Sequence, residues 1–219
     1  MVVILKPVKL AMLPDICKDT AYFIGVGLGN SSGQPAILVL KRTNWETGER
    51  SRYDYSRRLV SRFEVSRWDR FAPDALQGLI AARAAEISRE AGVSGKATFL
   101  VDTTGDGGSF VRKMHLENIG VCRVLSVAVT GPDAEAHQNN TYFLPRRGLI
   151  AGLLTTMEKC QFTFPPSVHG IEALEGELAR MQAAWRTGGL PALDRTNPSD
   201  TVIAMAMAVW RAKKFEFYE

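Results

Sequence analysis

The sequence contains no hydrophobic run that approaches the roughly 20 apolar residues a helix needs to cross a bilayer. It begins MVVILKPVKLAMLPDICKD, which lacks the charged start, long apolar centre and small-residue end of a signal peptide. We therefore expect a protein of the cytoplasm with no membrane partner, and we interpret residues 1–20 as an N-terminal arm or strand.

Cysteine is scarce, with three residues far apart in the chain: Cys17, Cys122 and Cys160. No CxxC pair occurs, so neither a zinc site nor a disulfide framework is indicated, and we expect buried or neutral thiols. The G-x-x-x-x-G-K-[ST] motif of P-loop ATPases is also missing.

The composition is that of a globular protein with a full core, since 46% of the 219 residues are hydrophobic and 23% are charged. The net charge of +4 permits an anionic partner without requiring one. Between Lys41 and Arg70 there are nine basic and five acidic residues, so this segment carries a net charge of +4, equal to that of the whole chain. Trp45, Tyr53, Tyr55 and Trp68 are interleaved with these charges. This segment is equally compatible with a nucleic-acid-binding face and with a hairpin whose arginines pair with local acids.

Hydrophobic periodicity predicts an α/β protein. The order is three strands, a helix, a strand, a helical turn, a strand, a helix, a short strand and two helices, which indicates a mixed sheet with helices packed on it. The expected strands are 21–27, 36–42, 58–65, 97–101, 121–129 and 161–164, and the expected helices 74–92, 146–159, 171–185 and 201–212.

The first turn, IGVGLGN at 24–30, has glycines at Gly25, Gly27 and Gly29. A dinucleotide-binding fingerprint needs a helix after its glycines, whereas AILVLKR follows here and is typical of a strand. The actin-like and sugar-kinase group also uses glycine-rich turns for phosphates, but those proteins usually need two such domains and a longer chain. Both alternatives are therefore disfavoured.

Two aspartates occupy positions suited to a ligand site. Asp102 follows the buried strand ATFLV, and clefts open where strands end. Asp200 precedes a helix that is apolar on nearly all faces, TVIAMAMAVW. Each also has a structural interpretation, because an aspartate at such a place caps a helix and stabilises that helix by about 1 kcal/mol.

Together these motifs resemble the nuclease domain of phage terminase large subunits. The matching segments, in the family's order, are VGLG at 26–29, AILVL at 36–40, VDTTGDG at 101–107, PRRGLIAGL at 145–153 and SDTVIAMAMA at 199–208. The resemblance implies an RNase H-like domain over residues 21–219, with a mixed central β-sheet and helices on both faces.

The resemblance also implies a function. It predicts metal-dependent endonucleolytic cleavage of double-stranded DNA, with Asp102 and Asp200 as catalytic metal ligands for Mg²⁺ or Mn²⁺. Arg146, in place of the family's lysine, and Arg147 are expected to contact DNA phosphates. The packaging ATPase domain, the small terminase subunit and the portal are the protein partners it suggests.

The chain departs from the family pattern at two acids. Gly27 stands where the first acid is expected, and Ser199 stands where the companion of Asp200 is expected. Asp106 and Asn30 are alternative ligand donors by sequence distance. We therefore expect weak cleavage or none, a gain of activity in Gly27→Asp, and, as the alternative, an inactive RNase H-like module that binds DNA or a packaging partner.

Overall fold

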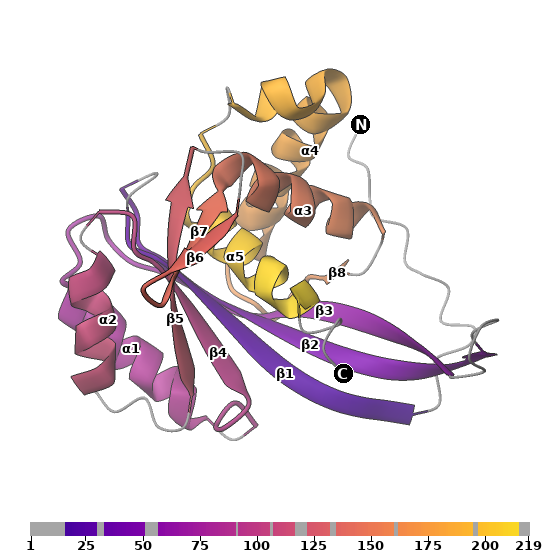
Figure 1. The fold of residues 1–219 in the computed structure, drawn as a ribbon, viewed down its shortest axis with the longest axis horizontal. Coiled ribbons are helices and arrows are strands. Elements are labelled where there is room, and N and C mark those ends of the chain that lie inside the picture. Colours follow the sequence, from indigo (N-terminus) through magenta and orange to yellow (C-terminus); the bar gives the residue numbers. More distant parts are fainter. Residues whose placement is uncertain are drawn as a thin grey trace.

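The computed structural model describes residues 16–29, 33–50, 57–90, 92–105, 107–116, 122–131, 135–159, 162–194 and 197–214. Its centre is a mixed sheet of eight strands in the order β6-β7-β5-β4-β1-β2-β3-β8. The ribbon in Figure 1 shows helices packed on this sheet. The predicted α/β class with a mixed sheet is confirmed.

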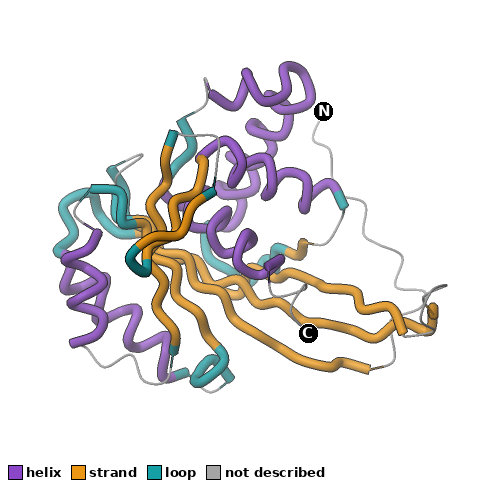
Figure 2. The backbone as a smooth tube through the Cα atoms, viewed as in Figure 1, coloured by secondary structure: helices purple, strands orange, loops and turns teal. Residues whose placement is uncertain are grey.

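The chain begins the sheet with an antiparallel meander of three long strands, β1 (Ile16–Gly27), β2 (Ala36–Arg50) and β3 (Arg57–Arg70). β1 starts at Ile16, inside the segment that the sequence assigned to an arm or strand, and residues 1–15 lie outside the described residues. The far ends of these strands extend beyond the helices as a ribbon, which Figure 2 shows clearly.

The parallel half of the sheet follows on the other side of β1. β4 (Ala97–Asp102) pairs with β1, β5 (Arg123–Thr130) pairs with β4, and β7 (Thr141–Pro145) pairs with β5, all in parallel. β6 (Ala136–Gln138) forms an antiparallel hairpin with β7, and β8 (Phe162–Thr163) extends the sheet beside β3. Since β1, β4, β5 and β7 run the same way, their carboxyl ends meet at one edge.

The hairpin of β6 and β7 was not predicted from the sequence. Its turn is Asn139-Asn140, and both residues have positive φ values, 50° and 61°. Asparagine tolerates this conformation, and two-residue turns of this kind match the twist of a hairpin. β6 is exposed along its whole length, so the hydrophobic alternation that reveals a strand is absent there.

Helices cover both faces of the sheet, as predicted. α1 (Gln77–Arg89) and α2 (Gly107–Leu116) lie on one face, over a core that includes Val26 and Val101. The opposite face carries α3 (Arg146–Glu158), α4 (Ile171–Asp194) and α5 (Asp200–Lys214). α4 runs nine residues beyond the predicted helix end and kinks at Gly189, where φ is 58° and ψ is −148°.

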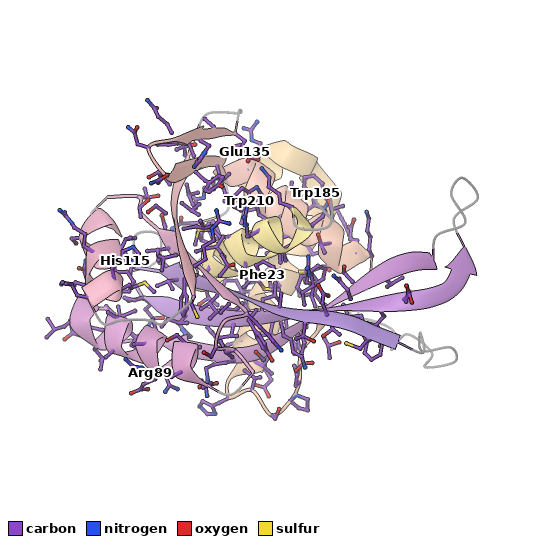
Figure 3. The ribbon with its side chains drawn as sticks, turned by 60° about the horizontal axis from the view of Figure 1, so that its bottom comes forward. Phe23, Arg89, His115, Glu135, Trp185 and Trp210 are labelled. Atoms are coloured by element: carbon purple, nitrogen blue, oxygen red, sulfur yellow. The ribbon has the colours of Figure 1, made fainter. Side chains whose placement is uncertain are left out.

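α5 lies directly on the sheet at the centre of the second core. The residues from Asp200 to Val209 are all buried, and α5 packs on β1, β2 and β4. Its last turn is held by Arg42 of β2, which is 2% exposed and donates from Nη1 to the carbonyl of Ala212 at 2.8 Å. Figure 3 shows Phe23 of β1 beneath this helix and Trp210 near its carboxyl end.

Two of the three cysteines lie in the part of the chain that the structure describes. Cys17 is exposed and Cys122 is half-buried, and neither forms a disulfide, whereas Cys160 lies outside the described residues. Among the described helices, none combines the length and the apolar character that a membrane span would need.

Candidate functional site: the Gly27 junction and the arginine pocket

The two predicted aspartates lie near Gly27, Asp102 on the neighbouring strand and Asp200 at the start of the helix that covers it. Val26 pairs with Val101 in the parallel register, so Gly27 and Asp102 are the next residues on neighbouring strands. Alternation along β4 places Asp102 on the same face as Leu100, which belongs to the core beneath α5. Asp200 is the first residue of α5, and its backbone lies against Gly27. We call the group of Gly27, Gly29, Asp102 and Asp200 the Gly27 junction.

The glycines of β1 have a packing role in this junction. A Cβ atom on Gly25 would lie 2.0 Å from the carbonyl oxygen of Ala204. A Cβ on Gly27 would lie 2.7 Å from the carbonyl oxygen of Asp200 and 2.8 Å from its Cβ. No side chain fits at these distances, so both glycines allow the backbone of α5 to rest on β1.

Both carboxylates are hydrogen-bonded to the backbone. Asp200 is fully buried, and its Oδ1 accepts a bond of 3.1 Å from the amide of Gly29. Asp102 is 2% exposed, and its Oδ1 accepts from the amide of Thr104 at 2.9 Å. Asp200 therefore ties the turn after β1 to α5, and Asp102 shapes the loop that leads to α2.

The burial of these residues argues against the metal centre that the resemblance implies. Mg²⁺ keeps several waters beside its carboxylate ligands and therefore needs open space, whereas both aspartates are buried and bonded to amides. The described residues contain no group of three histidine, cysteine or acidic side chains suited to a metal. Asn30 and Asp106, the alternative donors, lie outside the described residues.

The geometry also argues against the gain of activity expected for Gly27→Asp. The resemblance predicts that an aspartate at residue 27 supplies the missing metal ligand and so increases activity. Instead the backbone of Asp200 occupies the space where the new Cβ would stand. The substitution would displace α5 before its carboxylate could serve as a ligand.

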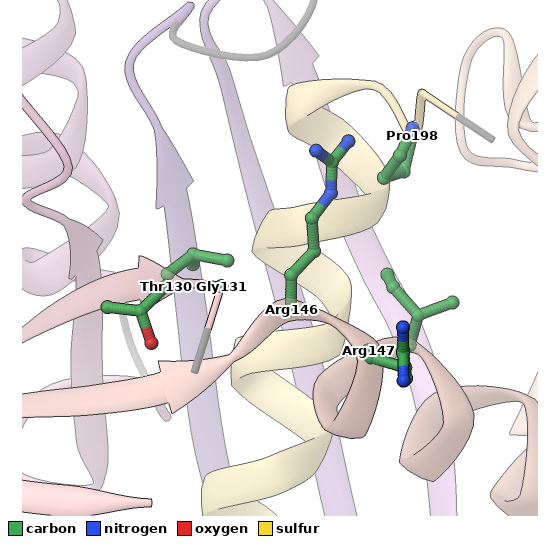
Figure 4. A pocket seen from close by; sticks show the side chains of 7 residues that line it. Thr130, Gly131, Arg146, Arg147 and Pro198 are labelled. Carbon is green, nitrogen blue, oxygen red and sulfur yellow. The ribbon is translucent and has the colours of Figure 1, made fainter. Parts of the chain in front are cut away.

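An open pocket lies close to the junction, at the carboxyl ends of β5 and β7. It has a volume of about 280 Å³, and we call it the arginine pocket; its lining residues are Val129, Thr130, Gly131, Arg146, Arg147, Ile150 and Pro198. Figure 4 shows Arg146 extending from the start of α3 alongside α5 toward Pro198. The sequence singled out both arginines, but nothing in it revealed Pro198 or the end of β5 as the opposite walls.

The charge of this pocket suits an anion. Two guanidinium groups line it at the amino-terminal end of α3, where the helix dipole also favours negative charge, and none of the lining residues that the structure describes is acidic. Arg146 is oriented by Asn197, whose Oδ1 accepts from Nη2 at 2.9 Å. The planar guanidinium is the side chain best matched to phosphate oxygens.

The basic segment from Lys41 to Arg70 is a weaker candidate. Each of its five described basic side chains is engaged within the chain, with the partners Glu64 for Lys41, Asp19 and the Ala212 carbonyl for Arg42, the Trp45 ring for Arg62, Glu90 for Arg67, and Gln34 and the Trp68 ring for Arg70. The side chains of Arg50, Arg52, Arg57 and Arg58 are not described. Among the described side chains, only Lys41 pairs with an acid of the segment itself, whereas the arginines are held by acids or carbonyls from elsewhere in the chain, by Gln34 or by tryptophan rings.

Comparisons of the chain with family models, with curated proteins and with solved structures give no match.

Proposed function

We propose that this chain is an RNase H-like domain, similar to the nuclease domain of phage terminases, that binds duplex DNA through the arginine pocket and has little or no nuclease activity. DNA is the proposed partner because the two arginines of the pocket place positive charge at the edge of the sheet where the parallel strands end. The packaging ATPase domain, the small terminase subunit and the portal stay predictions from the resemblance.

The strand order supports the RNase H-like part of this proposal. An antiparallel meander followed by parallel β4 and β5 on the far side of β1 is the arrangement expected of that fold, and so is a final helix lying on the central strand. The resemblance motifs fall at the ends of β1, β4 and β7 and at the start of α5.

The observation that carries the proposal is the contrast in access between the two sites. The aspartates are buried and bonded to amides, whereas Arg146 and Arg147 line an open pocket at the same edge of the sheet. Phosphate contacts by arginine supply affinity that is largely independent of base sequence. Binding without cleavage is therefore the function that these residues support best.

A salt-dependent titration tests the binding. A labelled DNA duplex is titrated with the wild type, with Arg146→Ala/Arg147→Ala and with Arg89→Ala, a control that removes an exposed arginine of α1 on the other face of the sheet. We expect affinity to fall as salt rises, with the double variant weaker and its log–log slope reduced by about 0.9 for each lost phosphate contact. Binding that ignores salt, or that the double variant retains, would refute the proposal.

A digestion assay tests the catalytic half separately. Plasmid DNA is incubated with Mn²⁺ and the wild type or Asp102→Ala. We expect no cleavage above background in either sample. Cleavage by the wild type that disappears in Asp102→Ala would instead support the metal-dependent nuclease.

A further inference from the structure

The segment Asn197 to Asp200 joins the arginine pocket to the Gly27 junction. Asn197 accepts the hydrogen bond from Arg146, and Pro198 is buried and lines the pocket. Two residues later, Asp200 bonds to the amide of Gly29. One wall of the pocket is thus a short stretch of chain that is fixed where α5 begins.

Glu177 of α4 holds the middle of this segment. Its Oε1 accepts from the backbone amide of Ser199 at 2.8 Å, and its Oε2 accepts from the Ser199 hydroxyl at 2.7 Å. Ser199 in turn caps α5, since its Oγ accepts from the amide of Val202 at 3.4 Å and its carbonyl accepts from Ile203 at 3.0 Å. The carboxylate also lies at the amino-terminal end of α5, where the helix dipole favours it.

The identity of residue 199 fits this arrangement. The resemblance expects an acid there, but an aspartate at 199 would face the Glu177 carboxylate with like charge and could not donate a hydrogen bond to it. Serine supplies the donor that Glu177 requires. The family pattern expects an acid at residue 199; in this chain that residue is serine, and an acid on α4, 22 residues away in sequence, accepts its hydrogen bond.

We infer that Glu177 is a positioning residue for phosphate binding: through Ser199 it fixes Asn197, and through Asn197 it fixes Arg146 in the arginine pocket. This inference rests on the proposed function. In a nuclease of this family, the start of α5 would hold metal ligands. In this protein, it would instead support one wall of the DNA-binding pocket. Glu177 itself does not line the pocket.

The sign of the effect separates this role from simple electrostatics. Removing an acid from a DNA-binding surface should strengthen binding or leave it unchanged, because less negative charge opposes the phosphates. If Glu177 positions Arg146, its removal should weaken binding instead. Glu175, exposed on the same helix, provides the matched control.

The experiment compares DNA affinity across salt for Glu177→Ala, Glu177→Gln and Glu175→Ala. We expect Glu177→Ala to weaken binding about threefold to tenfold and to lower the salt slope as Arg146→Ala does. Glutamine retains an acceptor for the amide and a donor for the hydroxyl, so Glu177→Gln should bind like the wild type. Glu175→Ala should bind as tightly as the wild type or more tightly.

A double-mutant cycle completes the test. In the Arg146→Ala background, Glu177→Ala should have no further effect, because the residue it positions is gone. An additive loss, or equal behaviour of Glu177→Ala and Glu175→Ala, would overturn the inference while leaving the DNA-binding proposal intact. If Arg146→Ala alone leaves binding unchanged, the proposed function fails first. Should Glu177→Ala not fold, Ser199→Ala replaces it, with the same expected weakening.

Discussion

The Gly27 junction and the arginine pocket lie at the same edge of the sheet, yet they are built in opposite ways. The junction is closed: a helix backbone rests on glycine, and buried carboxylates bond to amides. The pocket is open, and its arginines are only half-buried. Residues in the first should therefore control stability, and residues in the second should control binding.

The largest expected effect is that of Gly27→Asp. Its Cβ would overlap the backbone of Asp200, and its carboxylate would be buried beside the carboxylate of Asp200. We expect a loss of about 3 kcal/mol or more in the free energy of unfolding, measured by urea denaturation. Gly27→Ala, which adds the Cβ alone, should lose about 1–3 kcal/mol.

Gly152 of α3 is the matched control for these variants, because a Cβ there would meet nothing within 4 Å. Gly152→Ala should stabilise the protein by up to about 1 kcal/mol, since alanine is the better helix former. A Gly27→Asp protein as stable as the wild type, with Mn²⁺ raising its melting temperature, would show that the junction opens to admit a metal.

The next effect concerns Asp200. Alanine would leave the amide of the half-buried Gly29 without this acceptor, so Asp200→Ala should lower the free energy of unfolding by about 1–3 kcal/mol. Asparagine keeps an oxygen at the same place, so Asp200→Asn should lose clearly less. Equal losses in the two variants, measured by urea denaturation, would show that the negative charge rather than the hydrogen bond holds the turn.

Asp102 should give a smaller loss of the same kind. The carboxylate of Asp102 accepts a hydrogen bond from the amide of Thr104, two residues away, and so shapes a local loop. Asp102→Ala should therefore lower the free energy of unfolding by about 1 kcal/mol. Hydrogen exchange should report the change locally, as faster exchange of the Thr104 amide. Unchanged exchange there would contradict the role assigned to this carboxylate.

The smallest effect on stability is expected at the arginine pocket. Arg147→Ala removes a half-buried surface charge, which typically changes the free energy of unfolding by no more than about 0.5 kcal/mol. The same variant should weaken DNA binding. A loss of stability as large as that of Asp200→Ala would remove the distinction between the two sites.

Much of the fold could be predicted because local patterns decide it. Helical spacing located α1, α3 and α5 to within a few residues, and apolar runs located β4, the last part of β1 and the first part of β2, which continues to Arg50. The hairpin of β6 and β7 could not be predicted, since the exposed residues of β6 carry no hydrophobic alternation. The start of β1 was placed too late because its first residues are mostly polar and pair at the end of the ribbon.

The site was less predictable than the fold. The sequence brought attention to Asp102, Asp200, Arg146 and Arg147, but a pattern of residue types does not contain the distance between two backbones. The role of Gly27 depends on how closely α5 approaches β1, and that of Glu177 on how α4 meets the start of α5. Both are tertiary contacts, which no local signal encodes.

The placement of α5 has a consequence for how the protein is made. This helix is the last described element of the chain, yet it packs on the first described strand and is held there by Gly25, Gly27 and Arg42. Contacts this distant in sequence form late in folding, because the intervening chain must first be ordered. During translation, the apolar face of β1 and β2 therefore has no native cover until the ribosome has released residues beyond 200. The nascent chain should be most vulnerable to aggregation in that interval.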